Sequence, residues 1–154
     1  MSSVTVSEKL KKLAKDLTRD YPRSPRETLG GYVLAARILD KCRADLNGTN
    51  GEYNFNCPLD QTFFEFTGID ADEFKAFVAT GALDEEVDKW IRSHSKQTER
   101  IEVVKWNNWL RYLTVKDLPE ELQVIMEDYI RENIPAGRVV YHYFDIYDIE
   151  EKRL

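Results

Sequence analysis

The sequence predicts an all-α fold, a compact single-domain helical bundle or orthogonal array of about six to seven helices. Apolar residues recur through most of the chain at the three- and four-residue spacing that places them on one face of a helix. Residues that cap or terminate helices, chiefly Ser, Asp, Pro and Gly, stand at the ends of these segments.

Length and composition fit one globular domain. A chain of 154 residues has the usual size of a single domain. Its 42% hydrophobic and 12% aromatic residues supply enough apolar surface for a core. The sequence contains no internal repeat, low-complexity tract or linker. We therefore expect a single helical domain over residues 1–154.

Two helices are expected in the first third of the chain. Ser7 can cap a short helix that ends near Leu17. The segment Ser24–Glu27 has the composition of a capping box with proline in the first turn, and it predicts a longer helix to about Leu46. Gly30-Gly31 would lie inside that helix and cost about 1 kcal/mol per glycine relative to alanine. We expect another helix, or a ligand, to pass close to the backbone there.

A polar loop, Asn47–Asn56, separates this region from five further predicted helices. Proline or aspartate stands at the start of most of them. They are expected at about 59–67, 70–81, 84–95, 98–112 and 119–134. The tail, 138–154, has two interpretations: Val139–Phe144 has the composition of an extended strand, whereas Ile146–Arg153 fits a terminal helical turn.

Charge and patterning exclude several classes of partner. Lys plus Arg total 22 against 28 Asp plus Glu, so the net charge of −6 opposes binding to nucleic acid. Lysines interrupt the leucines of residues 1–17, and no apolar stretch approaches the roughly 18 residues of a membrane span. Two cysteines make no disulfide framework, which fits a reducing compartment. We expect a cytoplasmic protein with no nucleic-acid or membrane partner.

The sequence offers no recognisable set of metal or cofactor ligands. The two Cys and two His are scattered, whereas a zinc site needs about four such ligands at short spacing. The loop segment Gly48–Gly51 lacks the Lys-Ser/Thr ending and the preceding strand of a nucleotide-binding loop. We expect neither a metal nor a cofactor.

The main candidate site lies on the helix predicted from Ser24. Arg37, Asp40 and Arg43 follow one another at intervals of three, so they are neighbours on a helix. A guanidinium held by a carboxylate suits a carboxylate or phosphate ligand, and a helix start also favours an anion. The alternative is an ion-pair network that fastens the loops to this helix. The candidate ligand-binding residues are Arg23, Arg26, Tyr32, Arg37, Asp40, Arg43, Glu52, Tyr53, Asn56, Cys57 and Asp60.

Arg26, Arg37, Asp40 and Arg43 are expected to form one connected polar network with the loop around Glu52 and Asn56. Cys57 stands at a predicted helix start, which favours a reactive thiolate, although Asp60 in the same turn opposes it. A buried, inert thiol is the more common structural role for such a cysteine.

The C-terminal half carries most of the tryptophan. Trp90, Trp106 and Trp109, together with Phe77 and Tyr112, occur at helical spacing. Such aromatic residues are typical of a core, and we expect them there. An exposed Trp109 would indicate a pocket wall or a subunit contact.

Several segments resemble a bacterial family catalogued only as domain of unknown function five-zero-six-nine. The resemblance covers nearly the whole chain and is most specific at its N-terminal signature. It implies a bacterial origin and a compact one-domain protein, and it implies no activity. The segments that carry it are Asp20–Glu27, Leu29–Tyr32, Ala36–Ala44, Gly51–Tyr53, Cys57–Asp60, Phe66–Ile69, Asp72–Phe74 and Phe144–Glu151.

These observations predict a binding or regulatory module for a small anionic ligand or an acidic partner segment. The alternative is a small cytoplasmic enzyme with an arginine-lined pocket and Cys57, Glu52 or Asp60 as its reactive group. We expect the ligand site in the N-terminal third, since residues 23–60 combine costly glycines, arginines and a long polar loop.

Overall fold

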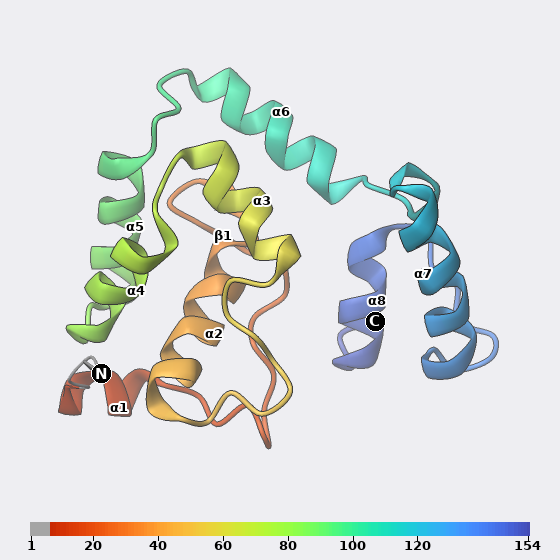
Figure 1. Cartoon of the computed structure of the whole chain (residues 1–154), viewed down its shortest axis with the longest axis horizontal. Coiled ribbons are helices and arrows are strands. Elements are labelled where there is room, and N and C mark those ends of the chain that lie inside the picture. The colour runs from red at the N-terminus through yellow and green to blue at the C-terminus, as the bar shows by residue number, and fades with distance from the viewer. Residues whose placement is uncertain (1–6) are drawn as a thin grey trace. The chain divides into compact units, whose positions relative to one another are not determined.

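The computed structural model describes residues 7–154 and is all-α (Figure 1). Within that range it contains eight α-helices, one 3₁₀ turn and one small hairpin. The elements are α1 Glu8–Leu13, β1 Thr28–Leu29, β2 Tyr32–Val33, α2 Ala35–Asn47, α3 Pro58–Thr67, α4 Ala71–Ala79, α5 Asp84–His94, α6 Arg100–Arg111, η1 Val115–Asp117, α7 Glu120–Asn133 and α8 Tyr143–Glu150.

The chain divides into two compact units, Met1–Val103 and Val104–Leu154. Helix α6 contains the boundary between them. Across residues 7–154, no helix is both long enough and apolar enough to cross a membrane.

The helix predicted from Ser24 to Leu46 is wrong in its first part. β1 and β2 pair antiparallel, and Gly30 and Gly31 form the two-residue loop between them. Their φ angles are 63° and 90°, the positive values that a tight hairpin loop requires at both positions. Glu27 still accepts a hydrogen bond from the backbone N–H of Ser24 at 3.2 Å. The capping contact therefore forms, but it closes a turn and starts no helix.

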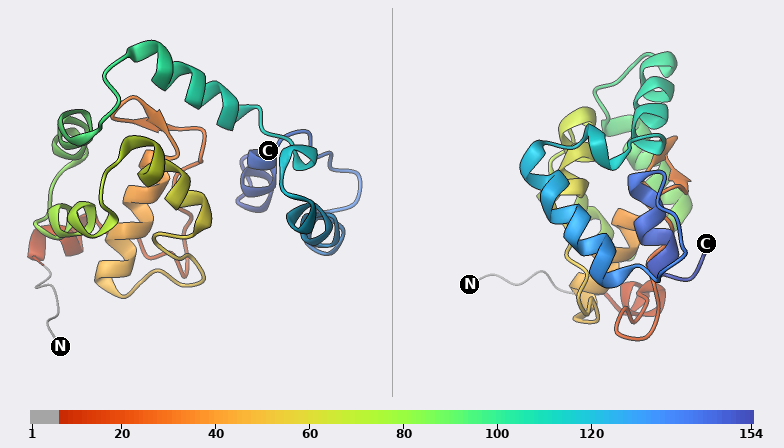
Figure 2. Two further views of the ribbon diagram at one scale, coloured as in Figure 1. Left: turned by 45° about the horizontal axis from the view of Figure 1, so that its top comes forward. Right: turned by 90° about the vertical axis from the view of Figure 1, so that its right-hand side faces the viewer.

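Helix α2 begins eleven residues later than expected and forms the centre of the first unit (Figures 1 and 2). Its N-cap Leu34 has a φ of 74°, an uncommon value for a bulky side chain, and is fully buried. Every residue from Ala35 to Ala44 is buried, and α2 contacts α1, α4 and β1. The helix ends at Gly48 in the left-handed conformation.

The close approach expected at the glycine pair is confirmed, and the passing element is α5. The N–H of Gly30 donates to the Asp88 carboxylate at 2.7 Å. A Cβ added to Gly30 would lie only 2.7 Å from Cγ2 of Ile91. The pair therefore serves two needs, the turn geometry and the packing of the hairpin against α5.

The five helices expected after the polar loop are confirmed, with ends that differ by one or two residues. Helix α3 ends at Gly68, which adopts the left-handed conformation. Asp70 caps α4 by accepting from the amides of Asp72 and Glu73. In the first helix, Ser7 caps α1 as expected, but α1 ends at Leu13.

In the second unit, α7 and α8 pack through a small apolar cluster of Ile134, Ile146 and Ile149. The strand interpretation of the tail is wrong, because α8 includes Tyr143 and Phe144. The Asp145 carboxylate accepts from the amides of Tyr141 and His142, at 2.9 Å and 2.8 Å, and so caps α8. This cap outweighs the β-propensity of the preceding residues.

The tryptophans do not all lie in a core. Trp106 is 8% exposed, but Trp109 is 52% exposed, which corrects the expectation that it is buried. Trp90 is half-buried and stacks on Phe77 and His94, with ring centroids 5.3 Å and 4.0 Å away. The expectation rested on the usual burial of aromatic residues, and it was wrong for Trp109 on the outer face of α6.

Candidate functional site

The first unit contains a partly buried network of guanidinium and carboxylate groups. The Asp40 carboxylate accepts from the Arg23 backbone N–H at 2.8 Å and from its guanidinium at 3.0 Å and 3.1 Å. Asp84, at the start of α5, binds Arg23 at 2.8 Å and Arg43 at 2.9 Å. Arg43 also donates to the carbonyl of Ala82 at 2.9 Å. These contacts join the chain before β1, helix α2 and helix α5.

The electrostatics of this network follow from its pairing. Burial would raise the pKa of Asp84, but the guanidinium groups of Arg23 and Arg43 outweigh it and hold the pKa below its usual value. Burial would lower the pKa of Arg23, and the Asp40 and Asp84 carboxylates raise it instead. Within residues 7–154, one buried atom of the network, Nε of Arg43, has no hydrogen-bond partner. The pairing therefore favours the charged forms of Arg23 and Asp84.

The observed network of arginines and carboxylates differs from the one expected from the sequence. Arg23, Asp40 and Arg43 are brought together, but their additional partner is Asp84 on α5 and not the loop at Glu52, which is exposed. The sequence interpretation missed Asp84 because it stood 41 residues beyond Arg43 as an ordinary helix-start aspartate.

Two predicted residues lie elsewhere. The backbone N–H of Arg26 donates to the Ser24 hydroxyl at 3.1 Å, so Arg26 belongs to the turn before the hairpin. Tyr32 lies on β2, shares a 2.7 Å hydrogen bond with Ser95 and packs edge-on against Phe63. Its ring therefore has a clear packing role in the core.

A second group, which we call the Lys41 cluster, consists of Lys41, Asn56, Cys57 and Asp60. Lys41 is 5% exposed, and its Nζ donates to the Asp60 carboxylate at 2.9 Å. The same Nζ lies 3.4 Å from Sγ of the half-buried Cys57. Asp60 is fully buried and also accepts from the backbone N–H of Asn56 at 3.0 Å. A buried ammonium, a buried carboxylate and a partly exposed thiol therefore meet at one point.

The backbone around this cluster presents the start of helix α3. Cys57 is its N-cap, Pro58 is its first residue, and within the described chain Cys57 makes no side-chain capping hydrogen bond. Asn56, just before it, has a φ of 61°, a left-handed conformation that asparagine tolerates better than most residues. The positive end of the α3 dipole therefore lies at the Lys41 cluster.

Arg37 extends this face along α2. It stands four residues before Lys41, so the two side chains are neighbours on the helix. Its guanidinium donates to the Arg23 carbonyl at 3.2 Å and lies over the ring of Tyr53, 5.5 Å from the centroid. Such a contact fixes the orientation of the guanidinium plane.

The structure thus divides the candidate residues into two groups. Arg23, Asp40 and Arg43 hold elements of the fold together, whereas Arg37 contacts Tyr53 of the polar loop and the Lys41 cluster joins α2 to the start of α3. Lys41 was missed because a lysine in a charged helical segment usually lies in solvent. Its four-residue spacing from Arg37 was the signal that could have revealed it.

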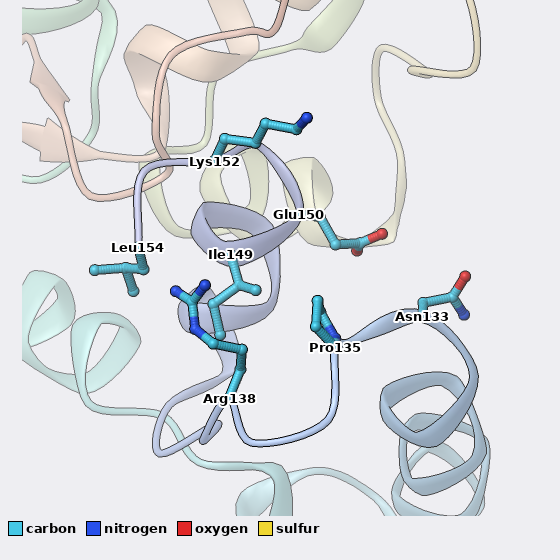
Figure 3. A pocket seen from close by; sticks show the side chains of 7 residues that line it. All are labelled: Asn133, Pro135, Arg138, Ile149, Glu150, Lys152 and Leu154. Carbon is cyan, nitrogen blue, oxygen red and sulfur yellow. The ribbon is translucent and has the colours of Figure 1, made fainter.

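The second unit contains a pocket of about 370 Å³ between the end of α7 and the end of α8. Arg138 and Lys152 line it, together with Pro135, Ile149 and Glu150. Figure 3 shows the Arg138 guanidinium beside Ile149, whereas the Lys152 side chain extends away from it. Glu150 is held by the hydroxyl of Tyr129 at 2.6 Å. These lining side chains are surface groups for the most part.

Across residues 7–154, no group of three or more His, Cys, Asp or Glu side chains is arranged to hold a metal ion. Both cysteines are free thiols. The available chemistry of the first unit is therefore that of paired charges, helix-end amides and the Cys57 thiol.

Residues 19–153 match the model of a protein family described as "Domain of unknown function (DUF5069)". The chain belongs to this family. The match includes both units of this DUF5069 protein and nearly all of its described residues. Curated proteins show no match to the sequence.

Proposed function

We propose that this DUF5069 protein is a binding or regulatory module for a small anionic ligand, held on the face formed by Arg37, Tyr53 and the Lys41 cluster. The observation that carries the proposal is that Lys41 of α2 lies at the positive end of α3, with Arg37 one helical turn away on α2. Asp60 balances one of those cations. The positive end of α3 and the oriented Arg37 guanidinium both suit a carboxylate or phosphate ligand.

The chemistry of the face suits a compact, planar or tetrahedral anion. The Arg37 guanidinium offers a fork of donors in a fixed plane, since Tyr53 and the Arg23 carbonyl orient it. The backbone amides at the start of α3 add donors of the kind that bind phosphate groups. The carboxylate of an acidic side chain has the same chemistry, so the proposed site also suits an acidic segment of a partner protein.

The pocket beside Arg138 is the competing location within the chain. It has comparable volume to many ligand pockets, but its Lys152 side chain does not point to the same place as Arg138. The Arg37 face also includes Lys41, a buried cation whose position is fixed by a buried carboxylate. Pre-positioned charges bind anions at lower entropic cost than mobile surface side chains do.

The proposal is tested by thermal-shift titration of the full chain with inorganic phosphate and with a small dicarboxylate. We expect both to raise the melting temperature in a saturable manner, because a ligand of the native state stabilises it. Arg37→Gln should remove this shift, and Arg138→Gln should leave it unchanged. Loss of the shift in Arg138→Gln alone would assign the site to the other pocket and contradict the proposal.

The alternative of a small enzyme is favoured by one observation, the 3.4 Å approach of the Lys41 ammonium to the Cys57 thiol. Asp60 is fully buried and Glu52 is exposed and apart from the cluster, so Cys57 is the remaining reactive group. A neighbouring cation is the kind of group that activates a thiol for nucleophilic attack. Rapid alkylation of Cys57 by iodoacetamide at neutral pH, in the native protein, would favour this alternative over the binding module.

A further inference from the structure

Lys41 and Cys57 hold an amine and a thiol of the same chain in contact. Nζ lies 3.4 Å from Sγ, and Asp60 fixes Nζ from its other side at 2.9 Å. Lys41 is nearly inaccessible, whereas Cys57 is only half-buried. A small oxidant can therefore reach the sulfur, while the nitrogen stays beside it.

We propose that Cys57 and Lys41 are a modification site, at which a peroxide produces a nitrogen–sulfur cross-link between α3 and α2. The proposal is supported by the contact between the two side chains. The reaction does not require the anion proposed above, so a failure to observe anion binding would not count against the cross-link.

The reaction balances with one molecule of hydrogen peroxide. Cys57 sulfur attacks a peroxide oxygen, the O–O bond breaks, and sulfenic acid and one water form. Lys41 transfers its extra proton to Asp60, and its neutral nitrogen then attacks the sulfur. The S–O bond breaks, a second water leaves with a proton from the nitrogen, and an S–N bond remains. Sulfur is oxidised by two electrons, and the peroxide is reduced.

The other cysteine provides an internal contrast. Cys42 follows Lys41 directly in the sequence but is completely buried, and that burial raises the pKa of its thiol. A buried thiol kept in its protonated form is a poor nucleophile toward peroxide. Cys57 should therefore be oxidised first, and its sulfenic acid should meet the Lys41 nitrogen before it meets another thiol.

Peptide mapping by mass spectrometry tests the proposal on the full chain after treatment with dilute hydrogen peroxide. Free thiols are alkylated, and the protein is then digested with a protease that cleaves after acidic residues. We expect the peptides that carry Lys41 and Cys57 to be joined, with Cys42 alkylated and with a mass two hydrogens below the sum of the two peptides. A thiol reductant should release them, because thiols attack and open bonds to oxidised sulfur.

Two variants complete the experiment. Lys41→Arg keeps a cation beside Asp60 but has no amine, so Cys57 should proceed to sulfinic acid with no joined peptide. Cys42→Ser is the matched control and should cross-link like the wild type. The proposal is overturned if wild-type Cys57 becomes sulfinic acid, joins a second chain by a disulfide, or stays reduced while Lys41 remains free. If Lys41→Arg does not fold, mapping of the wild type and of Cys42→Ser decides the matter: a Cys42–Cys57 disulfide would leave Cys42 unalkylated, would be absent from Cys42→Ser and would overturn the proposal.

Discussion

Helices α2 and α7 have similar lengths, 13 and 14 residues, and opposite surroundings. In α2 every residue from Ala35 to Ala44 is buried, including four charged ones. Within Glu120–Asn133 no residue of α7 is buried, although its sequence carries an apolar stripe at helical spacing. Ile125 on that stripe is 57% exposed.

The difference shows that a helix in this protein is buried where other elements provide packing and hydrogen-bonding partners, and that an apolar stripe alone does not bury it. The charged residues of α2 are buried because carboxylates, carbonyls and an aromatic ring meet them from α3, α5 and the loops. Helix α7 packs on its small cluster through Met126 and Ile130 and is hydrogen-bonded to the η1 region through Gln123, and most of its other residues are exposed. Each prediction below tests one side of this contrast.

The largest effect is expected for Asp60→Ala. This change leaves the Lys41 ammonium buried without a carboxylate, which should lower the free energy of unfolding by about 3–5 kcal/mol. The measurement is urea unfolding at neutral pH. Asp45→Ala is the control, because the Asp45–Lys75 pair has the same kind of contact but is one-third exposed. It should cost no more than about 1 kcal/mol, and equal losses in the two variants would refute this account of burial.

Gly30→Ala should follow, with a loss of about 2–4 kcal/mol. A positive φ costs a non-glycine residue about 1–2 kcal/mol, and the new methyl group would overlap Ile91 on α5. Gly48→Ala separates the two causes, because its φ is also positive but, within residues 7–154, no atom lies within 4 Å of the added Cβ. The melting temperature of Gly30→Ala should be well below that of Gly48→Ala. Similar melting temperatures would show that α5 moves to accommodate the methyl group.

A smaller effect concerns acid and the network around Asp84. The folded-state pKa of this carboxyl lies below its ordinary value, so its contribution is present above pH about 4 and is lost as pH falls through the lowered pKa. Asp84→Asn should therefore lower stability at pH 7 and reduce the further loss between pH 5 and pH 3. Urea unfolding at these pH values measures it. Glu85→Gln, the exposed neighbour, should keep the wild-type profile.

The smallest effect is expected on α7. Ile125→Ser should change the free energy of unfolding by less than about 0.5 kcal/mol, because the side chain is mostly in solvent. Ile146→Ala, in the buried cluster of the same unit, should cost about 2–5 kcal/mol. A large loss for Ile125→Ser would mean that α7 is covered in solution by a partner or a second copy of the chain.

The sequence predicted the helical class and most of the helix ends, because local signals such as Asp70 and Gly68 act within one turn. It failed at the hairpin, where a capping box and a Gly-Gly turn competed, and the packing of Gly30 against α5 favoured the turn. Contacts between segments that are distant in the sequence also determine which residues form the candidate site. Arg37 and Cys57 were identified by their local surroundings. Lys41 acquires its role from Cys57 and Asp60, 16 and 19 residues away, and Asp84 acquires its role from Arg43 and Arg23, 41 and 61 residues away.

The most direct test of the proposed site is a titration of the isotope-labelled full chain with inorganic phosphate, followed by backbone amide NMR. If the face on α2 and α3 binds the anion, the amides of Leu59 and Asp60 and the side chain of Arg37 should shift together and saturate. The signals of Arg138 and Lys152 should stay in place. Saturable shifts at Arg138 and Lys152, with Leu59 and Asp60 unchanged, would contradict the account and move the ligand site to the second unit.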